Sequence, residues 1–205
     1  MSERLRGSKY FRDILLQDVI EQHSLAGPQK TLEEASEFLR SQLPDGSGEN
    51  TKYRVLYAIH RIRDDKANGI FDSNSEDFET IGTCTLKPGM TVPIHDHMTT
   101  KTNEATGVLR LEIGYQFLPE VWGKGYATEA CIALLDACRK SNSHFAPYTS
   151  LYIDGVVSPD NPASMKVLEK AGLKQIGLNA WEGEPVFLAG AMRDPVVWVY
   201  SIKVF

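Results

Sequence analysis

The sequence predicts a mixed α/β domain, and three observations support that prediction. Apolar and polar residues alternate over several short segments, which is typical of strands with one packed face. In other segments apolar residues recur every three or four positions, as on a helix that packs against a sheet. In the middle of the chain a predicted strand runs into a glycine turn at Gly123 and Gly125 and then directly into a helix. The 205 residues suffice for one large domain, or one domain with a small extension.

The N-terminal part is expected to differ from the rest. Residues 1–30 are polar and irregular, and we interpret them as an N-terminal extension or an atypical first strand and helix. Residues 31–205 form the main domain, without internal repeats or a linker. Thr31 and Glu34 have the spacing of a capping box, which predicts a helix that runs to Leu43.

Three strands are expected in the first half of the main domain. Apolar and polar residues alternate through Tyr53–Ile62, and the next strand, Phe78–Leu86, ends before a Pro-Gly pair. The third strand, Val108–Leu118, has four apolar side chains on one face. The polar segment Thr91–Thr106 between the last two strands is expected to be a long loop.

The second half alternates helices and strands. Helical spacing places Cys131 and Cys138 on the apolar face of a helix, so they are expected in the core. A later helix begins at Pro162 and is terminated by Gly172. The predicted elements are helices at Gly125–Lys140 and Pro162–Ala171, strands at Thr149–Val157, Lys174–Leu178 and Val196–Val204, and a connection at Trp181–Arg193.

Bulk composition excludes several classes of function. The net charge of −5 disfavours general binding to nucleic acid, and no apolar run is long enough to span a bilayer. Three cysteines without metal-ligand spacing argue against a disulfide framework or a zinc site. We therefore expect a protein of a reducing compartment, the cytoplasm with the nucleus as an alternative, that binds neither nucleic acid nor membrane.

The glycine turn predicts a site for a phosphate or pyrophosphate. A helix start presents unpaired backbone N–H groups at the positive end of the helix dipole. A P-loop requires a Ser or Thr after its lysine, but Gly125 follows Lys124. A Rossmann fingerprint is expected near the first strand and has a third glycine, whereas this turn lies in mid-chain. Both nucleotide-binding motifs are thus disfavoured.

A second segment identifies the kind of protein. Its pattern, Asn161-x-x-Ser164-x-x-x-Leu168-Glu169-Lys170-x-Gly172, follows the glycine turn after one helix and one strand. Together the two segments resemble the GNAT acetyltransferase superfamily, in particular the branch of the ribosomal-protein N-terminal acetyltransferases. One departure is Trp122, which stands where the family's motif has Gln or Arg.

The resemblance implies a GNAT fold and an acetyl-CoA site. The fold has a mixed, mostly antiparallel sheet, flanked by helices and splayed at the strand before the turn. The pyrophosphate would lie on the backbone amides of Trp122, Gly123, Lys124, Gly125, Tyr126, Ala127 and Thr128. Backbone groups near Phe117 and Leu118, freed by the splay, would pair with the pantetheine, and Asn161 would contact the pantetheine or a water.

The implied reaction is transfer of acetyl from acetyl-CoA to an amine by direct attack. Glu112, on the strand that leads to the turn, is the candidate base that takes the amine's proton. Many family members protonate the leaving thiolate with a helix tyrosine, but Leu168 occupies that position here. Ser164 is the substitute that we predict, with Asn161 as a further candidate catalytic residue.

Each of these residues also has a purely structural interpretation. Asn161 before a proline is a good helix cap, and Glu112 would face away from its apolar neighbours as a solvated strand residue. The pair His95 and His97 lacks further metal ligands nearby, so a surface loop is favoured over a metal site. This loop and the Trp181–Arg193 connection are candidates for lining the acceptor site.

Several functional alternatives stay open at the level of sequence. The acceptor amine could be a protein N-terminus, a lysine or a small amine, and the protein a monomer or a homodimer. The rival function is a non-catalytic acyl-CoA-binding GNAT module that acts as a sensor or assembly surface. A weaker rival is a nucleotide-binding protein that uses the same turn.

Overall fold

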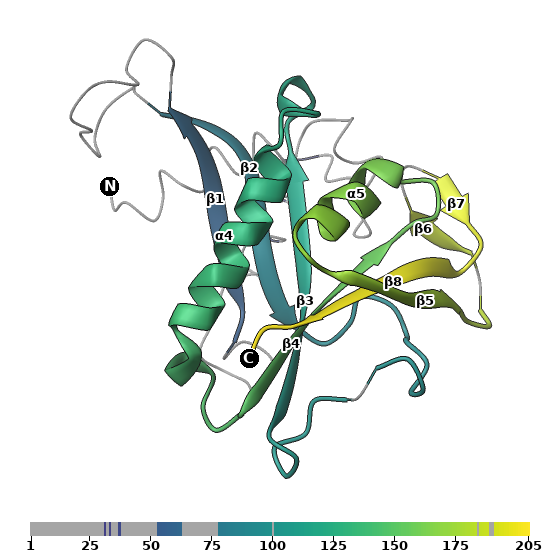
Figure 1. The fold of residues 1–205 in the computed structure, drawn as a ribbon. Coiled ribbons are helices and arrows are strands. Elements are labelled where there is room, and N and C mark those ends of the chain that lie inside the picture. Colours follow the sequence, from purple (N-terminus) through teal and green to yellow (C-terminus); the bar gives the residue numbers. More distant parts are fainter. Residues whose placement is uncertain are drawn as a thin grey trace.

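A six-stranded sheet forms the centre of the molecule (Figure 1). The computed structural model describes residues 31, 33, 37, 53–62, 78–99, 101–183, 185–188 and 191–205. The sheet has the order β1-β2-β3-β4-β8-β5, in which β3 and β4 run parallel and every other neighbouring pair is antiparallel. Its strands are β1 (Val55–Ile62), β2 (Phe78–Pro88), β3 (Val108–Phe117), β4 (Ser150–Val157), β5 (Lys174–Ala180) and β8 (Val196–Lys203). The predicted mixed, mostly antiparallel sheet is confirmed.

Two helices lie side by side on one face of this sheet (Figure 1). They are α4 (Tyr126–Lys140) and α5 (Pro162–Lys170). Odd-numbered residues of β3, such as Leu111 and Ile113, pack against Cys131 and Leu134 of α4 and Leu168 of α5. This alternation along β3 is the one predicted from the sequence, and the predicted burial of the two α4 cysteines is confirmed.

The connections contain short elements that the sequence pattern did not predict. Two 3₁₀ turns, η3 (Pro119–Val121) and η4 (Asn142–Phe145), flank α4. The connection after Trp181 contains a small hairpin of β6 (Val186–Leu188) and β7 (Ala191–Arg193). These elements are too short to show a period of their own.

Some predictions lie outside the described residues. These are the N-terminal extension at 1–30 and most of the helix after Thr31. The predicted loop between β2 and β3 is confirmed for residues 89–99 and 101–107, where an isolated bridge pairs Asn103 with Val108. Within the described part of the chain, no helix is long and apolar enough to cross a membrane.

Candidate active site

The sheet opens between its two parallel strands. Pairing of β3 with β4 runs from Val108↔Ser150 to Glu112↔Asp154 and stops there, although both strands continue. Figure 1 shows β3 continuing alongside β2 while β4 turns away with β8 and β5. A wedge-shaped opening therefore starts at the Glu112↔Asp154 pair, as the resemblance predicted.

The glycine turn follows the C-terminal end of β3, beyond the Glu112↔Asp154 pair where the opening begins. Gly123 and Gly125 have positive φ angles of 73° and 92°, a backbone conformation that favours glycine. Gly125 is the N-cap of α4 and has no side chain to cap it, and the first helical bond runs from Glu129 N–H to the Gly125 carbonyl at 3.0 Å. The N–H groups of Tyr126–Thr128 precede that bond, so this helix start is open to an anion.

Backbone groups of β3 point into the opening between the strands. The Leu118 N–H donates to the Ile81 carbonyl of β2 at 2.9 Å, which makes Phe117 and Gly82 a non-hydrogen-bonded pair. The N–H and C=O groups of Phe117 and Tyr115 therefore face away from β2. Of the backbone groups near Phe117 and Leu118 that were predicted to be freed for the pantetheine, the Leu118 N–H is not available, because β2 still pairs with the end of β3.

Trp122 closes the turn onto the end of β3. Its indole Nε1–H donates to the Phe117 carbonyl at 2.7 Å, and its backbone N–H donates to the Pro119 carbonyl at 3.1 Å. Nearly half of the Trp122 side chain stays exposed. The departure from the family's Gln or Arg thus fixes the turn through an indole hydrogen bond.

A shallow groove continues from the turn between the two helices. It has a volume of about 480 Å³ and is lined by Gly125, Thr128, Glu129, Ile132, Ala133 and Asp136 of α4 and Lys170 of α5. Ile132 and Ala133 supply apolar surface, and Lys170 supplies a positive charge. A ligand held at the helix start can therefore extend into this groove.

Glu112 lies on the opposite face of the sheet from the helices, at the point where the strands part. It is buried, so the solvated interpretation is wrong. Its carboxylate accepts hydrogen bonds from the Thr91 backbone N–H and hydroxyl, and Lys87 Nζ lies 3.7 Å from Oε1. Burial raises the pKa of Glu112, whereas Lys87 and the Thr91 hydrogen bonds lower it and Asp154 raises it further.

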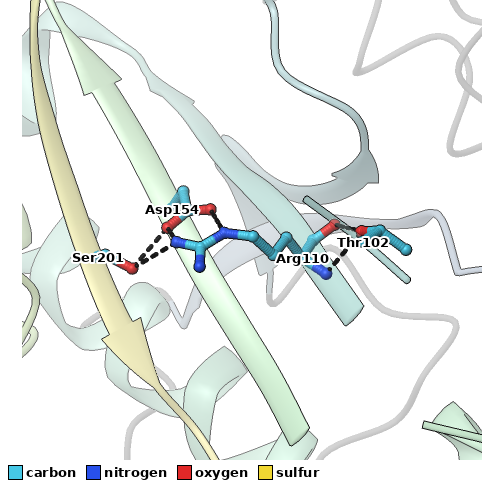
Figure 2. A network of polar contacts seen from close by, with 4 residues as sticks. All are labelled: Thr102, Arg110, Asp154 and Ser201. Carbon is cyan, nitrogen blue, oxygen red and sulfur yellow. Dashed lines mark hydrogen bonds and ion pairs between the residues drawn. The ribbon is translucent and has the colours of Figure 1, made fainter. Parts of the chain in front are cut away.

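A buried ion pair holds three strands together next to Glu112 (Figure 2). Arg110 of β3 binds Asp154 of β4 in bidentate fashion, with Nε donating to Oδ2 at 2.7 Å and Nη2 to Oδ1 at 2.5 Å. Ser201 of β8 accepts from Arg110 at 3.0 Å and donates to Asp154 at 2.5 Å. The Arg110 backbone N–H also donates to the Thr102 hydroxyl at 2.9 Å. These contacts fix the narrow end of the opening.

The second motif forms the start of α5. The Asn161 side chain accepts from the Ser164 backbone N–H at 3.0 Å, so the predicted capping role of Asn161 is confirmed. The Ser164 hydroxyl lies 2.7 Å from the Tyr115 hydroxyl, which also donates to the Ser164 carbonyl at 3.2 Å. Sequence reasoning placed Tyr115 only on the apolar face of its strand, and the pairing with a residue 49 positions away carried no local signal.

The predicted catalytic residues thus fall on two sides of the sheet. Tyr115 and Glu112 are three residues apart on a strand, so their side chains point to opposite faces. Ser164, which contacts Tyr115, therefore lies on the helix side, and Glu112 lies on the other. The opening between β3 and β4 begins at Glu112 and continues past the level of Tyr115.

The histidine loop packs over the Glu112 face. His95, Asp96 and His97 are exposed, and no cluster of metal-ligating side chains occurs among the residues that the structure describes. The loop is fixed by buried Asn179 of β5, which accepts from the His95 N–H at 3.0 Å and donates to the Pro93 carbonyl at 2.8 Å. The exposure of these three residues confirms that this segment is a surface loop.

A second hollow lies just past the end of β4. Its volume is about 350 Å³, and it is lined by Ser158, Pro159, Asp160, Met192, Asp194 and Val196. It adjoins Asn161 and includes Met192 of the predicted Trp181–Arg193 connection. The two aspartates make its surroundings suitable for a cationic group.

The fold and the candidate site share two features: a sheet that splays between two parallel strands, and a helix start beside the opening that a glycine leaves uncapped. The chain belongs to the acetyltransferase (GNAT) domain family, whose model matches residues 10–174. No curated protein sequence matches it with significance.

Solved structures of this family share the fold. A GNAT-family acetyltransferase from Bacillus anthracis is 18% identical, with a TM-score of 0.60 over 97% of this chain and 90% of its own. Spermidine N-acetyltransferase from Vibrio cholerae, solved with CoA and spermine, is 14% identical with a TM-score of 0.58, over 99% and 92%. RimJ from Mycobacterium smegmatis, solved with CoA-disulfide, is 19% identical with a TM-score of 0.62, over 98% and 78%.

Proposed function

We propose that this protein is an acetyl-CoA-dependent N-acetyltransferase that acetylates a primary amine by direct attack. The observation that carries the proposal is the open start of α4 beside the opening between β3 and β4. The similar structures solved with CoA and with spermine support the choice of cosubstrate and of an amine acceptor.

The cosubstrate binds along a continuous path. Its pyrophosphate lies on the amides of Gly123–Thr128, since the Trp122 N–H included in the sequence prediction is already bonded to the Pro119 carbonyl. The nucleotide end extends into the groove beside Lys170. The pantetheine follows the edge of β3 that faces the opening at Phe117 and Tyr115, as an added strand would. The Phe117 carbonyl on this edge already accepts a hydrogen bond from the Trp122 indole. Asn161 donates to it through the amide nitrogen that its capping bond leaves available.

The acceptor amine approaches from the hollow at the end of β4. Asp160 and Asp194 attract a cation there, and an alkylammonium ion must lose a proton before it attacks. Glu112 takes that proton through water. Each of its carboxylate oxygens accepts one bond from Thr91 and keeps a second lone pair for a water molecule.

The test is release of CoA from acetyl-CoA with a panel of amines: spermidine, a lysine peptide, and peptides with free N-terminal alanine or serine. Turnover with at least one amine supports the enzyme. Tight binding of acetyl-CoA without CoA release from any amine would favour the non-catalytic module.

Glu112→Gln tests the base. The amide keeps an acceptor for Thr91 but cannot take a proton, so kcat at neutral pH should fall about 100-fold. A base must be deprotonated, so the wild-type rate falls as the pH drops through the pKa of Glu112. Burial raises that pKa and places the fall closer to neutral pH than for an ordinary glutamate. The variant should lose this acid limb.

The matched control is Glu120→Gln in the exposed turn η3, which should keep both rate and pH profile. Unchanged kinetics in the Glu112 variant would remove this residue from the mechanism.

A further inference from the structure

The opening between β3 and β4 has an apolar floor on its helix side. Leu168 of α5 is buried there, and a Cβ placed on Gly155 of β4 would lie 2.7 Å from its Cδ1 and 3.5 Å from Ile113 of β3. The three residues therefore pack together just beyond the last β3–β4 pair. None of them has a proton to give to a leaving group.

The next contact between β3 and α5, on the side of the glycine turn, is polar. Tyr115 follows Ile113 on the same face of β3, and Ser164 precedes Leu168 by one turn on the same face of α5. The two hydroxyls are 2.7 Å apart. This hydroxyl contact links β3 to α5, as the apolar contact between Ile113 and Leu168 does. It lies beyond the last residue of β3 that pairs with β4.

We infer that Tyr115 is the catalytic residue that donates a proton to the departing CoA sulfur, with Ser164 passing a proton to Tyr115. The inference rests on the proposed function, which places the pyrophosphate at the turn and the thioester at the opposite end of the pantetheine arm. On that path the thioester reaches the floor of the opening, and among the described residues the Tyr115–Ser164 pair carries hydroxyl protons next to that floor.

The proton balance of the step is complete. The neutral amine attacks the thioester carbonyl, the C–N bond forms, and the C–S bond breaks with its electron pair leaving on sulfur. Tyr115 gives its hydroxyl proton to that sulfur. Ser164 gives its proton to Tyr115 at the same time and is reprotonated, through water, by the proton that the attacking nitrogen releases. The products are the N-acetyl amine and CoA thiol, and both hydroxyls are restored.

The environment of Tyr115 fits a donor that is protonated at rest. Burial raises the pKa of its hydroxyl well above the usual value, and this outweighs the opposite effect of the Ser164 hydrogen bond. The resting enzyme therefore presents a neutral hydroxyl throughout the neutral pH range.

The experiment is steady-state kinetics of Tyr115→Phe, with the best amine of the panel and acetyl-CoA as the varied substrate. The variant keeps the ring that packs against the core and loses only the hydroxyl. We expect kcat to fall about 100-fold while the KM for acetyl-CoA and the unfolding midpoint change little. Ser164→Ala should lower kcat less, because water can return the proton to Tyr115, and adding it to Tyr115→Phe should cause little further loss.

Tyr200→Phe is the matched control. Tyr200 is a buried tyrosine on β8, on the far side of β4 from β3, and its hydroxyl donates to Glu169 Oε1 of α5 at 3.3 Å. Its loss should leave kcat within twofold. A Tyr115→Phe enzyme with wild-type kcat, beside an active wild type, would overturn the inference and leave the proposed function intact. A wild type that binds acetyl-CoA but never releases CoA would overturn both.

Discussion

The starts of α4 and α5 carry the two motifs of this chain, and they are built in opposite ways. At α4 the N-cap is Gly125, which has no side chain, so the first amides of the helix have no cap from it. At α5 the side chain of Asn161 binds the Ser164 N–H and closes the helix start. Both are helix starts beside the same opening in the sheet. An uncapped start offers its amides to a ligand, whereas a capped start uses them for its own stability.

We expect the largest effect on CoA binding from a substitution at the uncapped start of α4. The Cβ of Gly125→Ala would meet no atom of the described residues within 4 Å, so it would stand in the space proposed for the ligand, and the substitution would disfavour the positive φ. Losing one charge-assisted hydrogen bond, about 1.5–3 kcal/mol, should weaken CoA affinity roughly 10- to 150-fold. Isothermal titration calorimetry with CoA measures this.

Gly172→Ala is the control, since Gly172 has a similar φ of 97° at the other end of α5. It should cost about 1–2 kcal/mol of stability through the same backbone effect, without changing CoA affinity. Equal losses of CoA affinity in the two variants would mean that Gly125 acts only through the fold.

The next largest effect, on stability and CoA affinity, is expected at the capped start of α5. Asn161→Ala removes the cap and should lower the free energy of unfolding by about 1 kcal/mol. Asn161→Asp keeps an acceptor for the Ser164 N–H and should restore this stability, but it removes the amide donor proposed for the pantetheine. Its CoA affinity should therefore fall about fivefold, the equivalent of one neutral hydrogen bond.

Urea unfolding and calorimetry on the two Asn161 variants separate these roles. Wild-type CoA affinity in Asn161→Asp would leave Asn161 as a cap alone.

The smallest effect is expected at Lys124. Its charge lies in the turn between the two glycines, where backbone amides rather than a side chain hold the pyrophosphate in our proposal. An exposed ion pair contributes about 0.2–1 kcal/mol, so Lys124→Ala should weaken CoA binding at most about fivefold. A loss of CoA affinity as large as that in Gly125→Ala would mean that the Lys124 side chain, rather than the backbone, binds the anion.

Sequence periodicity and capping signals predicted much of the fold and both helix starts. Alternation placed β3 and its buried face, and Asn161-Pro162 placed the first turn of α5. These features are local, so they are visible in a short window of sequence. The short hairpin β6–β7 was not predicted, because strands of three residues are too short to show a period.

The contacts within the site could not be predicted in the same way. Glu112 is buried because Thr91 and the loop that begins there fold over it, and Asn179, more than 80 residues further along, fixes that loop. Tyr115 meets Ser164 only because β3 and α5 pack together. The Leu118 N–H is taken by Ile81 of β2. Such contacts arise from tertiary packing between distant segments, and the pattern within each segment does not specify them.

The most direct test of the central claim, that the open start of α4 binds the pyrophosphate, is a backbone amide NMR titration. CoA and pantetheine, which lacks the nucleotide and pyrophosphate, are added separately to the ¹⁵N-labelled protein. We expect CoA to shift the Gly123, Gly125 and Thr128 amides strongly, pantetheine to leave them nearly unchanged, and the capped Ser164 amide to respond far less to CoA. If CoA binds while the Gly123–Thr128 amides keep their positions, the pyrophosphate lies elsewhere and the account is wrong.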